Sequence, residues 1–342
     1  MAELSGSPLP EIEPNGSQAP EQIPNWAWGI LASPGGGPLR REGRILWSTD
    51  RAIGRIDHGI LHFDMPREDP STEYYRKIGG AHFHGRSAVP YAMTALDTPV
   101  YHDYLKKFAP TDQDLLIVDV GGGDGRNALP WLRWGFERVV VVDSTAAALS
   151  RFRARVAAEN REWLKRIVLI ECDQRTLPLA DEVADRVMAI ESLYYLNEDY
   201  EAGLEQCHRV MQPRARLLLA DRSYEGALLT RLLYYGGVAA MLETARSRKM
   251  WDGEGDTRVR TRCFSRRELH ALVVAQGFEI VETGGISAFS LLLSFLAKSG
   301  GLGRESDAQL AVVHELLISL GQSGCCSRCH VVIAEKQSRR LT

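Results

Sequence analysis

The sequence has no excess of positive charge and few cysteines. Its 342 residues include 41 Lys and Arg against 44 Asp and Glu, which gives a formal net charge of −3. Nucleic-acid-binding domains usually carry a basic patch, and no such stripe stands out here. The six cysteines are too few for a disulfide scaffold in a chain of this length, so free thiols in a reducing compartment are the simpler interpretation.

Long hydrophobic runs are also missing. The longest apolar stretch, around 288–297, is shorter than the roughly 20 residues that a membrane helix needs. The first residues lack the basic and apolar regions of a signal peptide. We therefore expect a cytoplasmic protein without a membrane partner. Residues 1–24, rich in Pro, Glu, Ser and Gly, are predicted to be a disordered leader.

From residue 67 onward, β-like apolar runs alternate with helical patterns. Such alternation predicts an α/β fold with a mostly parallel sheet covered on both faces, and the last strand could be antiparallel. Residues 67–110 are expected to form N-terminal capping helices before this sheet. The predicted strands are 115–120, 139–142, 168–170, 184–190, 216–220, 279–283 and 331–334. The main predicted helices are 128–134, 146–165, 201–211, 267–276 and 307–320.

A glycine-rich turn follows the first of these strands, at Asp119-Val-Gly-Gly-Gly-Asp-Gly-Arg126. Glycines at a strand-to-helix turn let the backbone approach a ligand closely. A phosphate-binding P-loop would need a Gly-Lys-Ser/Thr that is missing, and the dinucleotide pattern Gly-x-Gly-x-x-Gly fails at Arg126. The spacing that remains is Asp-x-Gly-x-Gly-x-Gly.

Acidic residues end the next strands. Asp143 closes the second strand about 20 residues beyond the loop, where an acid can accept hydrogen bonds from ribose hydroxyls. Asp173 follows the third strand and Glu191 ends the fourth. Further along, His208-Arg-Val-Met-Gln-Pro213 leads into the fifth strand.

In this order, the motifs resemble those of class I S-adenosylmethionine-dependent methyltransferases over roughly residues 115–285. The resemblance implies a Rossmann-like sheet of seven strands, the last antiparallel, and S-adenosyl-L-methionine as cofactor. The glycines would border its methionyl part, Asp143 its ribose and Asp173 its adenine. The implied cofactor residues are Asp119, Gly121, Gly123, Gly125, Asp143, Ser144, Asp173, Gln174 and Glu191. A similar sheet that binds another nucleotide, or none, is the alternative.

Residues 25–66 form short apolar runs separated by glycines. They resemble the small zinc-ribbon-like module that accompanies some methyltransferases. Ser33, Ser48 and Arg51 stand where that module has zinc-binding thiolates, and a zinc site needs about four sulfur or imidazole ligands. We therefore predict a metal-free β module followed by a methyltransferase domain over 67–342.

The acceptor side is less well defined. His82, His84 and Glu191 are candidate catalytic bases, because the segment with the histidines should fold over the ligand crevice. Alternatively, the histidines only form interfacial hydrogen bonds. Aromatic walls of an acceptor pocket could come from Tyr194, Tyr195 and Tyr234, which could equally be core residues.

The segment 284–328 is a predicted insertion that would serve as a lid or as a homodimer surface. At its end, Cys325, Cys326 and Cys329 lie close together in sequence. The spacing before His330 fits a haem-attachment pattern, but the export that this attachment needs is not indicated. A thiophilic-metal site is conceivable. We interpret the cluster as a chance grouping at a loop-to-strand junction and predict no metal site.

These features predict an S-adenosylmethionine-dependent methyltransferase that acts on a small-molecule acceptor, with a role in specialised natural-product metabolism. Balanced charge argues against nucleic acid as partner. A ribosomal or transfer RNA methyltransferase is the first alternative, and a catalytically inactive binding subunit is the second. The sequence does not indicate whether oxygen, nitrogen, carbon or sulfur accepts the methyl group.

Overall fold

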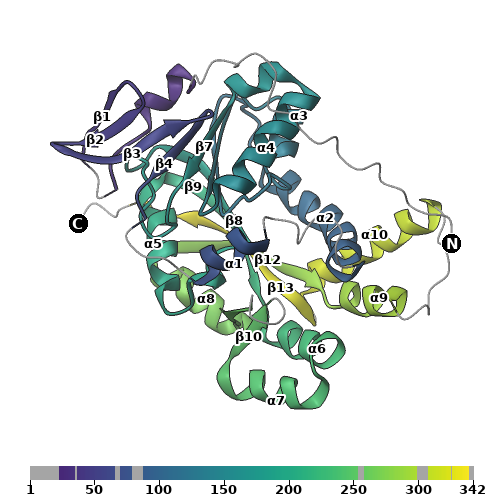
Figure 1. Cartoon of the computed structure of the whole chain (residues 1–342). Coiled ribbons are helices and arrows are strands. Elements are labelled where there is room, and N and C mark those ends of the chain that lie inside the picture. Colours follow the sequence, from purple (N-terminus) through teal and green to yellow (C-terminus); the bar gives the residue numbers. More distant parts are fainter. Residues whose placement is uncertain are drawn as a thin grey trace.

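A computed structural model describes residues 23–34, 37–65, 70–78, 88–252, 258–298, 307–324 and 326–338. In this part of the chain, eleven strands form one sheet in the order β1-β2-β3-β4-β7-β6-β5-β8-β9-β13-β12 (Figure 1). A separate two-stranded sheet pairs β10 (Lys249–Asp252) with β11 (Val259–Arg262).

The centre of the large sheet is parallel. Its strands are β5 (Leu116–Val120), β6 (Arg138–Asp143), β7 (Ile167–Glu171), β8 (Ala184–Ile190) and β9 (Met211–Arg222). Beyond β9, β13 (Ser327–Lys336) runs antiparallel to both of its neighbours, β9 and β12 (Phe278–Ser287). This arrangement confirms the predicted Rossmann-like α/β sheet with an antiparallel last strand.

The parallel strands are buried on both faces, which explains their nearly continuous apolar sequences. Val139, Val140, Val141 and Val142 have no exposed surface at all. One core layer lies between the sheet and helices α2 (Ala88–Phe108), α3 (Leu129–Arg133), α4 (Ala146–Glu159) and α10 (Asp307–Ser323). The other layer lies under α1 (Pro70–Ile78), α5 (Tyr200–Val210) and α8 (Arg266–Ala275).

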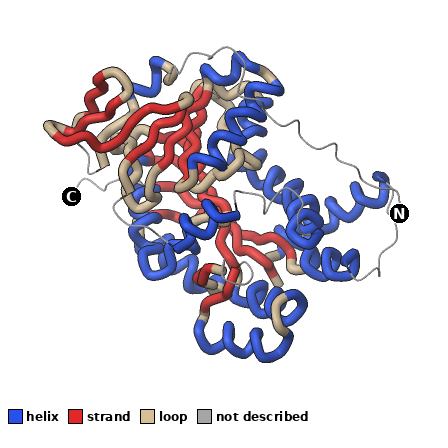
Figure 2. The backbone as a smooth tube through the Cα atoms, viewed as in Figure 1, coloured by secondary structure: helices blue, strands red, loops and turns tan. Residues whose placement is uncertain are grey.

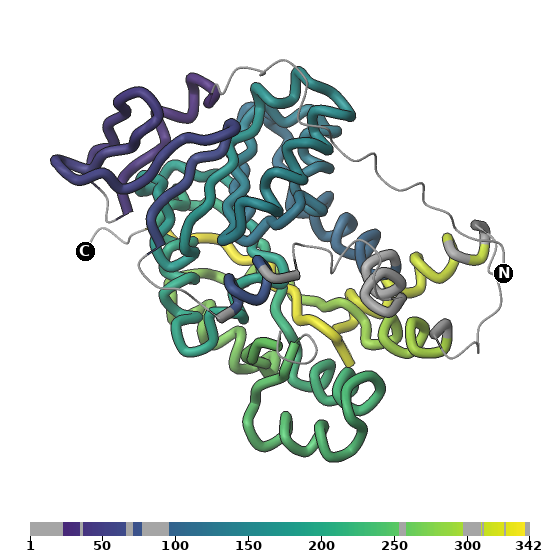
Figure 3. The backbone as a smooth tube through the Cα atoms, in the orientation of Figure 1, coloured from purple at the N-terminus to yellow at the C-terminus, as the bar shows by residue number. Residues whose placement is uncertain are grey.

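The N-terminal β module continues the main sheet. Four antiparallel strands, β1 (Leu39–Glu42), β2 (Ile45–Ser48), β3 (Arg51–Asp57) and β4 (Ile60–Phe63), follow a short 3-10 helix, η1 (Asn25–Gly29). The last of them, β4, pairs in parallel with β7. Figure 2 shows these strands running on into the sheet, and Figure 3 shows purple N-terminal strands beside teal strands distant in sequence. The module therefore shares the hydrophobic core of the larger domain.

Several element boundaries differ from the sequence prediction. The predicted helix 146–165 ends at Glu159, and a 3-10 helix, η3 (Arg161–Lys165), begins after Asn160, whose side chain caps it by accepting from the Glu162 N–H. The predicted insertion at 284–328 begins later, because β12 continues to Ser287. Gly284, the first residue of the predicted insertion, lies within this strand.

The connections around the sheet's lower end carry additional helices. After β9 come α6 (Tyr224–Tyr234) and α7 (Gly237–Ser247), at the bottom of Figure 1. Between β12 and β13 lie α9 (Phe289–Lys298) and α10, and both pack against α2. The β10–β11 hairpin was not predicted from sequence. Of the helices in the described ranges, none is long and apolar enough to cross a membrane.

Candidate active site

A cavity of about 480 Å³ lies at the carboxyl ends of the parallel strands. Ligands of open α/β sheets bind at this edge, because the loops that follow the strands converge there. Most of the predicted site residues line this cavity: Gly121, Gly123, Asp143, Ser144, Asp173, Gln174, Glu191, Tyr194, Tyr195 and Tyr234. Asp119, at the end of β5, and Gly125, in the glycine loop, do not line it. His82 and His84 fall outside the described residues.

The glycine loop is shaped by two close approaches. Gly121 and Gly125 both have positive φ, at 75° and 79°. A Cβ at Gly121 would lie 2.2 Å from Cβ of Ser192, and one at Gly125 would lie 1.9 Å from Phe152. These two glycines therefore let the loop pack tightly. At Gly123, by contrast, a Cβ would meet only Asp143 Oδ2, at 3.9 Å, so the loop is open on the side of the cavity.

Asp143, at the end of β6, holds the loop. Its Oδ2 accepts from the Gly123 N–H at 2.9 Å, and its Oδ1 accepts from the N–H and hydroxyl of Thr145 at 2.9 and 2.6 Å. Burial raises the pKa of this carboxyl, while these hydrogen bonds oppose the rise. The acid therefore links the glycine loop to the start of α4 and faces the cavity between them.

Two buried polar groups near the loop lack partners within the described ranges. Asp119 Oδ2 and Gln174 Oε1 are buried and accept no hydrogen bond from a described residue. Burial and the nearby Asp143 raise the pKa of Asp119 to about 8. A buried acceptor without a donor costs free energy, so such atoms suit a ligand that brings N–H or cationic groups.

Asp173, after β7, is already engaged by the protein. Its carboxylate accepts from the Arg175 guanidinium at 2.9 Å (Nε to Oδ1) and 2.6 Å (Nη2 to Oδ2), and Arg175 also bonds Asp199 at 2.7 Å. Both carboxylate oxygens of Asp173 therefore already accept from Arg175, although the residue lines the cavity. An adenine amino group would therefore have to share the acceptor oxygens of Asp173 with the Arg175 guanidinium.

Glu191, at the end of β8, is bound by Arg328 of β13 in a bidentate ion pair of 2.9 and 2.8 Å. The Tyr101 hydroxyl donates to it at 2.8 Å, and Arg126 lies 3.5 Å away. Burial works against ionisation, but Arg328, Arg126 and Tyr101 together hold the pKa of Glu191 well below its usual range. A carboxylate so stabilised is a poor proton acceptor, which is unfavourable for the general-base role suggested by the sequence.

A second buried arginine lies on the acceptor side. Arg222, at the end of β9, donates to the Tyr194 hydroxyl at 3.2 Å and to Asp252 Oδ2 at 3.1 Å. Tyr195 also donates to Asp252, at 2.6 Å. Tyr234 lines the cavity too, but its hydroxyl donates to the Leu291 carbonyl at 2.7 Å.

Several functional candidates were missed by sequence reasoning. Arg222, Arg328, Asp252, Tyr75 and Tyr101 all contribute to the cavity or its charge pairs. All of them lie outside the glycine loop, and Arg222, Asp252 and Arg328 are more than 90 residues away from it in sequence. The only sequence signal was the position of Arg222, directly after the fifth strand, where the carboxyl edge faces ligands.

In the β module, Ser33 and Ser48 carry hydroxyl groups at the positions where the resemblance to a zinc ribbon would place zinc-binding thiolates. Ser33 donates to the Gly37 carbonyl at 3.1 Å, and a Cβ at Gly37 would lie 3.0 Å from Ser33 Oγ and 3.8 Å from Ser48 Oγ. Arg51 is exposed. At the other end of the chain, Cys326 is exposed whereas Cys329 is buried. Among described residues, no group of three or more His, Cys, Asp or Glu could hold a metal ion.

Comparison with known proteins identifies the central part of the chain. Residues 117–214 match a family described as "Methyltransferase domain". The chloroplastic 2-methyl-6-phytyl-1,4-hydroquinone methyltransferase of Arabidopsis thaliana is 28% identical over 34% of this chain and 33% of its own length. Methyltransferase GfsG of Streptomyces halstedii is 32% identical over 33% of this chain and 39% of its own length. The chain thus spans little more than a third of these curated relatives.

Solved structures of methyltransferases overlap a larger share of the chain at lower identity. One is the Burkholderia thailandensis 1,6-didemethyltoxoflavin-N1-methyltransferase with bound 1,6-didemethyltoxoflavin and S-adenosylhomocysteine. It is 15% identical, covers 88% of this chain and 99% of its own, and has a TM-score of 0.48.

Proposed function

We propose that this chain, whose residues 117–214 match a methyltransferase domain, transfers a methyl group from S-adenosyl-L-methionine to a small-molecule acceptor. The observation that carries this proposal is the arrangement of the glycine loop and Asp143 at the edge of the sheet. There, the open side of Gly123 faces the cavity, and Asp143 joins the loop to the start of α4.

The residues of this chain fit the cofactor. Asp119 and Gln174 present buried acceptor atoms that no described residue satisfies, which suits the amino groups of the cofactor. Asp143 and Ser144 would lie at the ribose, and Asp173 at the adenine. When bound, the cofactor supplies a methyl group on a sulfonium, which needs mainly an acceptor positioned in line with it.

A small acceptor is favoured over RNA by the shape and lining of the cavity. Its volume of about 480 Å³ is in the range of small-molecule sites. The acceptor side is lined by aromatic residues, among them Tyr75, Tyr194 and Tyr195. An acceptor with an aromatic ring suits these walls, in keeping with the hydroquinone in the name of the Arabidopsis relative. A role in specialised metabolism is part of this proposal.

The proposal is tested first by cofactor binding. Titration calorimetry on the purified full-length protein should give a dissociation constant for S-adenosylhomocysteine in the micromolar range, about −8 kcal/mol. Asp143→Ala should weaken this binding at least about tenfold, because the loop and α4 lose their shared acceptor and the ligand loses its own.

Asp181→Ala is the matched control, since this exposed acid pairs with Arg209 and does not line the cavity. It should bind like the unaltered protein. Unchanged affinity in a folded Asp143→Ala variant would contradict the assignment of the cofactor site. Absence of any binding to the unaltered protein would favour the inactive-subunit alternative.

A further inference from the structure

We propose that the acceptor is methylated on a hydroxyl oxygen and that its proton leaves through a relay formed by Tyr75, Tyr195 and Asp252. This inference rests on the proposed function and adds the acceptor class and the path of the proton. It replaces His82, His84 and Glu191 as candidate proton acceptors with groups whose geometry is described.

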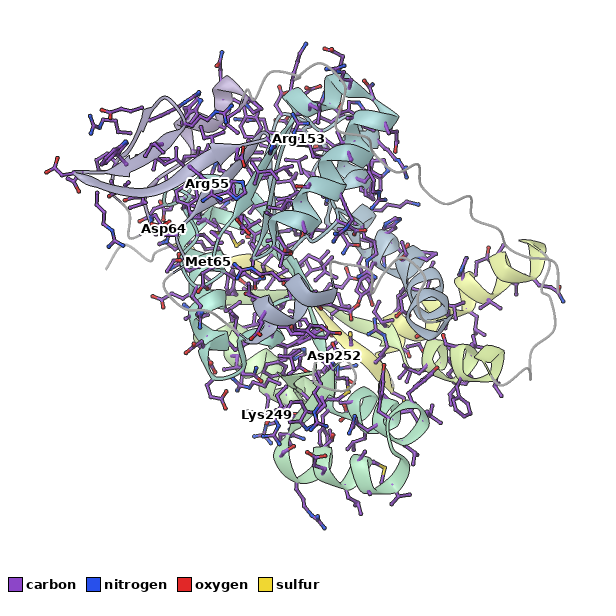
Figure 4. All side chains as sticks on the ribbon, viewed as in Figure 1. Arg55, Asp64, Met65, Arg153, Lys249 and Asp252 are labelled. Carbon is purple, nitrogen blue, oxygen red and sulfur yellow. The ribbon has the colours of Figure 1, made fainter. Side chains whose placement is uncertain are left out.

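The relay is a continuous line of short hydrogen bonds. The Tyr75 hydroxyl on α1 lies 2.5 Å from the Tyr195 hydroxyl, and Tyr195 lies 2.6 Å from Asp252 Oδ2 at the end of β10. All three residues line the cavity. Figure 4 labels Asp252, which lies close to α1 in that view. Three elements distant in sequence therefore deliver one chain of hydroxyl and carboxylate groups.

Arg222 fixes the far end of the relay. Its guanidinium donates to Asp252 at 3.1 Å and to the Thr261 hydroxyl at 2.9 Å, and it lies 4.6 Å from the centre of the Tyr194 ring. Asp252 Oδ2 accepts from one N–H of Arg222 and from the Tyr195 hydroxyl, whereas Glu191 is held by a bidentate pair with Arg328, by Tyr101 and by Arg126. An ionised carboxylate accepts hydrogen bonds and donates none.

The direction of each hydrogen bond in the relay follows from the carboxylate acceptor at its end. Tyr195 has one hydroxyl proton and must donate it to Asp252. The oxygen of Tyr195 can then only accept, so Tyr75 donates to it. The Tyr75 proton is thereby engaged as well, and what Tyr75 presents to the cavity is an accepting lone pair. A molecule bound beside Tyr75 must therefore offer a donor.

A hydroxyl is the donor that needs such a relay. A neutral amine nitrogen can attack through its free lone pair, whereas a hydroxyl oxygen is a weak nucleophile until its proton leaves. In the proposed step, the acceptor oxygen bonds to the methyl carbon, and the carbon–sulfur bond breaks with its electron pair remaining on sulfur. The hydroxyl proton passes to Tyr75, the Tyr75 proton to Tyr195, and the Tyr195 proton to Asp252. The products are a methyl ether, a neutral thioether and a protonated carboxyl.

The first test compares two probes that differ only in their donors. Calorimetry on the full-length protein with saturating S-adenosylhomocysteine would titrate hydroquinone and 1,4-dimethoxybenzene. Hydroquinone should bind about tenfold more tightly or better, because only it can donate to Tyr75. Tyr75→Phe should abolish this preference and leave the affinity for S-adenosylhomocysteine unchanged.

Tyr74→Phe is the matched control, because it removes a phenol one residue away that does not line the cavity. It should keep both the preference and the cofactor affinity. Equal binding of the two probes, or no binding of either, would overturn the relay. Failure of the unaltered protein to bind S-adenosylhomocysteine would instead contradict the proposed function.

The second test separates hydrogen bonding from proton transfer. Asp252→Asn keeps an oxygen that accepts from Tyr195, but an amide cannot take up the proton. Hydroquinone should bind this variant as before, while formation of 4-methoxyphenol, followed by mass spectrometry, falls about a hundredfold or more. Undiminished formation in Asp252→Asn would overturn the relay. So would methylation of aniline or thiophenol, but not hydroquinone, by the unaltered protein.

Discussion

Glu191 illustrates how a distant strand sets the chemistry of one side chain. Its place at the end of β8 could be predicted from sequence, because the strand is a clear apolar run followed by an acid. Its partner Arg328 could not, since 137 residues separate the two. The ion pair lowers the pKa of Glu191 and changes it from a candidate base into a fixed negative charge.

Buried His330 should make the protein sensitive to acid. Burial, together with repulsion from Arg266, lowers its pKa to about 4, whereas an unfolded histidine titrates near 6.5. The neutral ring also faces Glu225, at 3.7 Å, and His270. As the pH falls from about 6.5 toward 4, the unfolded chain takes up a proton that the folded chain resists. Stability is therefore lost in that window, by up to about 3 kcal/mol.

The measurement is urea unfolding at pH 7.5 and pH 5.0. His330→Leu should lose less stability between these pH values than the unaltered protein does. His58→Asn, which replaces an exposed histidine, should lose as much as the unaltered protein. Buried acids such as Asp221, whose pKa is raised to about 7, contribute equally to all three proteins and cancel in the comparison. An equal loss in His330→Leu would contradict the prediction.

At the scale of elements, strand β12 shows where sequence patterns mislead. Gly284 and Gly285 look like the end of a strand, yet both pair with β13. A Cβ at Gly284 would lie 2.0 Å from the Tyr104 hydroxyl and 3.1 Å from the Gly321 carbonyl oxygen. The glycine is needed because α2 and α10 approach the strand closely, which depends on tertiary packing that the local sequence does not encode.

Gly284→Ala should therefore destabilise the protein, by about 1–3 kcal/mol, because the added methyl group overpacks this contact. Chemical denaturation provides the measurement. Gly29→Ala is the matched control, since a Cβ there would meet nothing within 4 Å. Equal stability of the two variants would contradict the close packing of α2 against β12 at Gly284.

The order of the central elements was predictable because each strand and helix carries a strong local pattern. Of the relay residues, only Tyr195 was a predicted site residue. Its hydrogen bonds with Tyr75 and Asp252 could not be predicted, because they depend on how α1 and the β10–β11 hairpin fold over the sheet. The hairpin itself escaped prediction because its strands are only four residues long.

At the scale of the whole molecule, we predict that the purified full-length protein contains no tightly bound zinc. Ser33 and Ser48, at the positions where the resemblance to a zinc ribbon would place thiolates, carry hydroxyl groups, and the apolar residues Leu46, Ile56 and Ile60 are buried in the shared core. Elemental analysis should give well under one zinc per chain, and a chelator should leave the Tm unchanged. One zinc per chain, lost upon substitutions within residues 30–60, would contradict this.

The position of β13 has a consequence for the order in which the molecule assembles. Although it comes after every other strand in the chain, β13 lies between β9 and β12, so β12 can join the sheet only when β13 has been inserted. Pairings between segments so far apart in sequence slow folding. Arg328 arrives with this strand and neutralises Asp97 at 2.7 Å and Glu191 at 2.8 Å. Until then Asp97 and Glu191 lack the guanidinium that joins them, so a folding intermediate without β13 should not yet recognise ligand.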